Sequence, residues 1–206
     1  MPCTGKDTLS LSLVERDPTF VLLRKHRAVP LPSLHSQEDT NYINVLPETF
    51  QALATNDRFL QFHERYGKKY GVSKDEYARL VRDQKIPIIH VGKYENLRAL
   101  RLGGLQAGLS VLLWADRAIV QSRLQERHQH RADGVEERLI AYDQEVAQLK
   151  HAAADCSDFD LIFENNGADK GAACEALLTL LRTPSAWSKD RAQATLTQLF
   201  QKARHP

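Results

Sequence analysis

Short apolar runs alternate with longer amphipathic segments in this chain, and this alternation constrains the fold more than any other feature. The segments Ile86 to Val91 and Leu109 to Trp114 are mostly apolar, whereas apolar residues between 135 and 149 recur every three or four positions. Strands buried on both faces appear as continuous apolar runs, and helices repeat with a period near 3.6. The sequence therefore predicts an α/β fold with a parallel sheet covered by helices on both faces.

The charge balance and the cysteines restrict the possible partners. The 206 residues include 28 Lys and Arg against 26 Asp and Glu, for a formal net charge of +2. This balance disfavours a nucleic-acid-binding arm, and no apolar run approaches the roughly 20 residues of a membrane span. Cys3, Cys156 and Cys174 form no C-x-x-C pair, so neither a disulfide scaffold nor a zinc site is expected. We expect a cytoplasmic protein without nucleic-acid or membrane partners.

The chain begins with residues typical of a phosphate-binding loop that opens a helix. Such a loop places backbone N–H groups, a lysine and a magnesium-binding hydroxyl around nucleotide phosphates. The sequence Gly5-Lys6-Asp7 matches the end of that loop, with Asp7 in the usual hydroxyl position and Thr8 next to it. The leading glycine and the strand that normally precede the loop are not seen. We therefore expect a fold in which the first strand is missing.

Further motifs follow in an order that resembles the guanylate kinase-like family of P-loop kinases. They are an arginine-bearing strand, a tyrosine-containing segment, a Tyr-Gly turn, two arginines eleven residues apart and a late Asn. The resemblance covers about Cys3 to Leu181. Within the family it is nearest to ribose 1,5-bisphosphate phosphokinases, on the evidence of Gly5-Lys6-Asp7, Tyr70-Gly71-Val72 and Asn165-Asn166.

The resemblance implies an ATP-dependent phosphotransferase that uses Mg²⁺ and a phosphorylated small-molecule acceptor. Lys6, Arg127 and Arg138 would neutralise charge on the transferred phosphoryl group, which is the main catalytic requirement of this chemistry. The implied ATP-binding residues are Thr4, Gly5, Lys6, Asp7, Thr8 and Asn165, with Asp7 or Thr8 also holding the metal. The implied acceptor-binding residues are Arg24, Arg27, Tyr42 and Tyr70.

The same resemblance divides the chain. Residues 1–183 would form the kinase domain, with an acceptor-binding insert at about 24–84 and a lid at about 127–138. Pro184 interrupts the chain, and the amphipathic segment that follows makes residues 184–206 a helical extension.

Two departures from the guanylate kinase pattern bear on the acceptor. The acidic residue that reads guanine in those enzymes is replaced by Gln61, and the later acidic strand reads Ile88-Ile89-His90-Val91-Gly92 here. These departures argue against GMP, and the resemblance then implies conversion of ribose 1,5-bisphosphate and ATP to 5-phosphoribosyl 1-diphosphate and ADP. Two alternatives remain open, namely a guanylate-type nucleoside monophosphate kinase and a non-catalytic guanylate kinase-like binding module.

Overall fold

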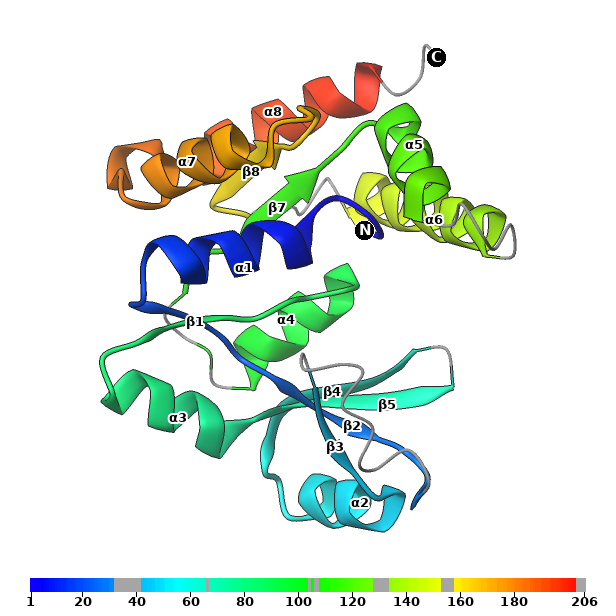
Figure 1. Ribbon diagram of the computed structural model, residues 1–206, viewed down its shortest axis with the longest axis vertical. Coiled ribbons are helices and arrows are strands. Elements are labelled where there is room, and N and C mark those ends of the chain that lie inside the picture. Colours follow the sequence, from blue (N-terminus) through cyan, green and yellow to red (C-terminus); the bar gives the residue numbers. More distant parts are fainter. Residues whose placement is uncertain are drawn as a thin grey trace. The chain divides into compact units, whose positions relative to one another are not determined.

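The computed structural model in Figure 1 describes residues 1–31, 42–65, 67–103, 105, 108–127, 134–152 and 158–202. The chain divides into two compact units, which are described one at a time. The first unit contains Met1–Leu13, Gly92–Tyr94 and Ala107–Pro206, and the second contains Val14–Val91 and Glu95–Gln106. Among the described helices, none has the length and apolar character needed to cross a membrane.

The first unit is built around a parallel pair of strands. Strand β7 (Val111–Trp114) pairs with β8 (Leu161–Glu164) over the full length of both. The helices that lie wholly or mostly in this unit are α1 (Lys6–Arg16), α5 (Arg117–Arg127), α6 (Val135–Ala152), α7 (Lys170–Leu181) and α8 (Lys189–Lys202), with the short 3₁₀ helix η3 (Pro184–Ala186) before α8. Residues 1–5 form turns, so no strand precedes α1 in the described chain.

Trp114 at the end of β7 is the centre of this unit's core. Its side chain is only 1% exposed and lies 6.1 Å from the ring of Phe200 in α8 and 6.4 Å from the ring of Tyr142 in α6. The Tyr142 hydroxyl donates a 2.8 Å hydrogen bond to the carbonyl of Ala115, and burial raises the pKa of this phenol. Leu196 and Leu199 of α8 are also buried, so the segment predicted as an extension contributes to the core.

The second unit carries two sheets. A parallel pair joins β1 (Phe20–Leu22) to β6 (Ile86–Ile88). The other sheet has four strands in the order β3-β2-β5-β4, with β2 parallel to β3 and antiparallel to β5. The strands of this mixed sheet are β2 (Lys25–Ala28), β3 (Tyr42–Val45), β4 (Phe59–Arg65) and β5 (Lys68–Ser73), and the helices are α2 (Pro47–Thr55), α3 (Lys74–Arg82) and α4 (Tyr94–Leu102).

Two apolar groups stabilise the second unit. One is the buried cluster of Leu23, Val72, Leu80 and Leu100, which joins the β1–β2 link, β5, α3 and α4. The other is aromatic, with the ring of Phe59 4.8 Å from that of Phe50 in α2. A Cβ at Gly71 would lie 2.6 Å from the Phe59 ring, so the close packing of this ring requires glycine at that position of β5.

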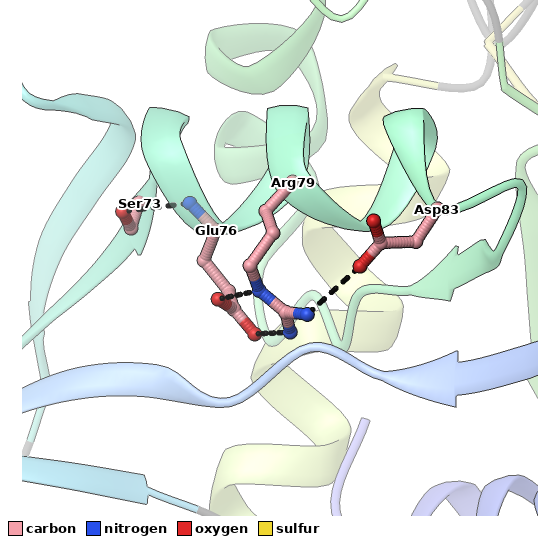
Figure 2. Close-up of polar contacts among 4 residues, drawn as sticks. All are labelled: Ser73, Glu76, Arg79 and Asp83. Atoms are coloured by element: carbon pink, nitrogen blue, oxygen red, sulfur yellow. Dashed lines mark hydrogen bonds and ion pairs between the residues drawn. The ribbon is translucent and has the colours of Figure 1, made fainter.

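Helix α3 begins directly at the end of β5, and local polar contacts hold it there (Figure 2). The Ser73 hydroxyl accepts a 3.3 Å hydrogen bond from the backbone N–H of Glu76, which is the usual N-cap arrangement. The Arg79 guanidinium donates to Glu76 at 2.8 and 3.0 Å and to Asp83 at 3.0 Å. The hydrogen bond from Arg79 is the main cause that lowers the pKa of Glu76. Arg79 is half exposed, so these ion pairs add little stability.

The structure confirms the α/β fold with parallel strands and helices, and it corrects parts of the predicted element pattern. Tyr70 and Gly71 lie inside strand β5, which begins at Lys68, so the prediction of a Tyr-Gly turn is wrong. Strand β6 covers Ile86–Ile88 and ends before Val91. The four-stranded mixed sheet was not predicted. Residues 128–133 of the predicted lid and Cys156 lie outside the described residues.

Candidate functional site

The predicted phosphate loop forms a compact turn immediately before α1. Gly5 has a φ of +96°, a conformation that glycine adopts without strain, and its carbonyl accepts the hydrogen bond of the Leu9 N–H at 2.9 Å. The Lys6 ammonium donates to the Met1 carbonyl at 2.9 Å, and the Thr4 hydroxyl donates to the same oxygen at 3.3 Å. The Lys6 ammonium therefore lies beside the backbone of the predicted phosphate-binding loop.

Asn165 joins this loop to the segment that follows β8. Its side-chain amide donates a 2.9 Å hydrogen bond to the carbonyl of Thr4, and both residues are buried, with 7% and 1% exposure. A Cβ at Gly5 would come within 2.3 Å of the Asn165 amide nitrogen. The structure thus brings Thr4, Gly5, Lys6 and Asn165 together, and it gives Asn165 a loop-holding contact besides the adenine contact that the resemblance implies.

The two predicted lid arginines lie at helix ends. Arg127 is the last residue of α5, and its side chain lies outside the described part of the structure. Arg138 is exposed in the first turns of α6, so its guanidinium is accessible to a ligand. The role of the two residues as a lid pair stays a prediction.

The predicted metal ligands, Asp7 and Thr8, are in the first turn of α1. No group of three or more His, Cys, Asp or Glu side chains that could hold a metal occurs among the described residues. Mg²⁺ in kinases is typically held by one or two protein oxygens, substrate phosphates and water. The exposed Asp7 carboxylate and the Thr8 hydroxyl are hard oxygen donors beside the loop, so they fit a metal that arrives with ATP.

Three of the four predicted acceptor residues share one face of the mixed sheet. Arg27 is paired with Tyr70 and with Asn44 on its two neighbouring strands, so these side chains form a row across the sheet. The Arg27 Nε donates to the Asn44 side-chain oxygen at 3.0 Å, and its guanidinium carbon lies 4.6 Å from the Tyr42 ring centre. The rings of Tyr42 and Tyr70 are 5.4 Å apart. A cation and two phenol hydroxyls on one face form an arrangement suited to a phosphate group.

His63 in β4 extends this row, and the sequence did not single it out. It pairs with Tyr70, and the two rings stack with centres 5.6 Å apart and an interplanar angle of 22°. The Gln61 amide nitrogen lies 3.0 Å from His63 Nδ1 and donates to the Asn96 side-chain oxygen of α4 at 3.1 Å. The Gln61 amide nitrogen carries two hydrogens, so it can supply both contacts when His63 Nδ1 is unprotonated. The alternation of Gln61 and His63 along one strand is the signal that could have identified this residue.

Arg24, the fourth predicted acceptor residue, is not brought to this row. It is exposed in the link between β1 and β2, and its charge contributes to the lowered pKa of Glu76 in α3. His26 is on the opposite face from Arg27, next to the Phe59 ring, and burial lowers the pKa of this imidazole against an opposing effect of Glu76. The acceptor role of Arg24 therefore rests on the resemblance alone.

Comparison with known proteins also indicates similarity to guanylate kinases. A search of protein-family models found no match. The chain is 28% identical over 180 residues to a guanylate kinase from Alkalilimnicola ehrlichii, covering 86% of this chain and 84% of that one. It is 25% identical over 161 residues to a guanylate kinase from Polaromonas, covering 78% and 74%. The crystal structure of guanylate kinase from Anaplasma phagocytophilum matches with a TM-score of 0.59 and 15% identity, over 86% of this chain and 80% of that one.

The chain has a guanylate kinase-like fold. The match in structure extends over most of both chains, so it includes residues of both units. These three relatives are named guanylate kinases, and none of the three carries the name of a ribose 1,5-bisphosphate phosphokinase. The finer resemblance to the latter enzymes therefore stays a prediction.

Proposed function

We propose that this chain is an ATP-dependent nucleoside monophosphate kinase of the guanylate type, which transfers a phosphoryl group from ATP to the phosphate of its acceptor. The observation that carries the proposal is the match to guanylate kinases over most of the chain, in sequence and in fold. The arrangement of Thr4, Gly5 and Lys6 at the start of α1 supports an ATP-binding role. Phosphoryl transfer depends mostly on positioning and charge neutralisation, which Lys6, Arg127 and Arg138 would supply together with Mg²⁺.

The acceptor phosphate would bind on the mixed sheet at Arg27, Tyr42 and Tyr70. Arg27 is held by Asn44 and by the Tyr42 ring, so its guanidinium is oriented before any ligand arrives. Such preorganisation lowers the entropic cost of ligand binding. The row therefore supports an acceptor that carries a phosphate group.

Ribose 1,5-bisphosphate remains a second candidate acceptor because of Gln61. This residue is 6% exposed, and the resemblance places it at the position of the acidic guanine reader of guanylate kinases. Its amide nitrogen is already engaged by Asn96 and His63, and it offers no negative charge to the N–H groups of guanine. A neutral amide is a weaker partner for those groups than a carboxylate. This substitution favours an acceptor other than GMP.

An acceptor panel tests both candidates. ADP release from Mg-ATP is measured with GMP, AMP and ribose 1,5-bisphosphate, for the wild type and for Gln61→Glu. The guanylate reading predicts the highest kcat/KM with GMP and a further rise in Gln61→Glu. Highest activity with ribose 1,5-bisphosphate would contradict the guanylate assignment and identify the sugar bisphosphate as the acceptor. No acceptor-dependent ADP release with any of the three would refute the kinase proposal and favour a non-catalytic binding module.

A further inference from the structure

Arg123 in α5 connects two loops of the first unit through their backbone carbonyls. Its Nη2 donates to the carbonyl of Asn165 at 2.9 Å and to that of Gly167 at 3.2 Å, and its Nη1 donates to the carbonyl of Cys3 at 3.5 Å. Cys3 belongs to the loop before α1, whereas Asn165 and Gly167 follow β8. One guanidinium therefore holds segments that are more than 150 residues apart in the chain.

These are the same two loops that the Asn165 side chain joins. The Asn165 side-chain amide donates to the carbonyl of Thr4, and the Asn165 backbone carbonyl accepts from Arg123. Arg123, Asn165 and Thr4 thus form a continuous chain of hydrogen bonds from α5 to the start of α1. A change at Arg123 would be transmitted to the loop that presents Gly5 and Lys6.

The positive charge of Arg123 is not neutralised by any carboxylate in the described part of the chain, where its hydrogen-bond acceptors are carbonyl oxygens. Arg117 on the same helix is different, because it forms a two-pronged ion pair with Asp143 at 3.0, 3.1 and 3.2 Å. Carbonyl dipoles orient a guanidinium without cancelling its net charge. Arg123, which is half-buried, therefore leaves a fixed cation beside the loop.

We propose that Arg123 is a positioning residue for the ATP site, which clamps the loop at residues 3–6 to the segment 165–167 and adds positive charge that favours the ATP phosphates. The proposal rests on the proposed function, because ATP binding by this loop is part of it. Among the side-chain types, only arginine can span three carbonyls with one planar donor group.

The test is the dissociation constant of Mg-ATP, measured by calorimetry on the full chain. Arg123→Lys keeps the charge but cannot reach all three carbonyls, and Arg123→Met removes both the charge and the clamp. Arg123→Lys would lose hydrogen bonds between a charged group and backbone carbonyls, and the usual strength of such bonds predicts about a tenfold weaker Mg-ATP affinity. Arg123→Met should weaken the affinity further. The matched control is Arg117→Lys, whose ion pair is about half exposed, and its affinity should stay within about twofold of the wild type.

A second measurement separates positioning from a general loss of structure. The KM for ATP and the KM for the acceptor are determined for each variant whose circular dichroism matches the wild type. We expect Arg123→Lys to raise the KM for ATP and to leave the acceptor KM unchanged. Equal increases in both, or Mg-ATP binding equal to that of the wild type, would overturn the inference. Mg-ATP binding that depends on Arg123 in a protein that transfers phosphate to no acceptor would instead contradict the proposed function alone.

Discussion

Replacing Gly5 with alanine should destabilise the chain for two separate reasons, and the structure allows each to be estimated. The φ of +96° at Gly5 is unfavourable for any residue with a Cβ, at a cost of about 1–2 kcal/mol. The added Cβ would also lie 2.3 Å from the Asn165 amide nitrogen and push it away from the Thr4 carbonyl. Leaving that buried carbonyl without its partner costs a further ~1–3 kcal/mol. We therefore expect Gly5→Ala to lower the free energy of unfolding by about 2–5 kcal/mol.

Gly134 provides a matched control for the backbone term. Its φ is +106°, and an added Cβ there would meet nothing within 4 Å. Gly134→Ala should therefore cost only the backbone strain, about 1–2 kcal/mol. The difference between the two variants measures the contact between Gly5 and Asn165.

The assay is urea unfolding followed by tryptophan fluorescence, to which buried Trp114 and partly exposed Trp187 both contribute, with the Mg-ATP dissociation constant measured on the same samples. Adding Asn165→Ala to Gly5→Ala should remove the clash, so the double variant should lose less free energy than the sum of the two single changes. Equal destabilisation in Gly5→Ala and Gly134→Ala, with full additivity in the double variant, would refute the reasoning about Asn165.

Three further changes address the two sites and α3. Lys6→Ala should lower kcat by about 10²-fold or more, because the lysine charge stabilises the transferred phosphoryl group, and a change below about fivefold in ADP release would contradict this. His63→Ala should raise the acceptor KM about five- to tenfold through loss of the stack on Tyr70, whereas His63→Phe should stay within about threefold, and equal effects of the two would exclude the stack as the cause. Glu76→Gln should lower the melting temperature by no more than about 3 °C at about pH 7. Since the folded-state pKa of Glu76 is lowered, its contribution is present above pH 4.5 and is lost as the pH falls through the folded pKa, so the melting temperatures of the two proteins should converge in acid.

The sequence was sufficient for strand β7, because the apolar run at Val111–Trp114 is a simple signal of a buried strand, whereas the pairing of the strands was not predicted. It was not sufficient for β2, whose residues Lys25–Ala28 are half-buried and mostly polar, with no apolar alternation to detect. Tyr70-Gly71 resembled a turn, yet both residues lie in β5. The glycine is needed there because the Phe59 ring leaves no space for a side chain. Tertiary contacts of this kind override the local preference of a residue.

The candidate site was predicted best where residues are close together in the chain. Thr4, Gly5 and Lys6 form one loop, and Asn165 joins it because the end of β8 lies beside the start of α1. Arg24 was not distinguished from Arg27, although only Arg27 lies in β2 and on the face of the acceptor row. The loop-holding role of Arg123 had no signal in the sequence, since its partners are backbone carbonyls.

The most direct test of the account is transfer of labelled γ-phosphate from Mg-ATP to a phosphorylated acceptor, followed by separation of the products. We expect the wild type to place the label on an acceptor phosphate, with GDP formed from GMP, and we expect Lys6→Ala to lose at least about 99% of that rate. Label that appears only as inorganic phosphate, or an unchanged rate in Lys6→Ala, would contradict the claim that this fold uses its N-terminal loop for phosphoryl transfer.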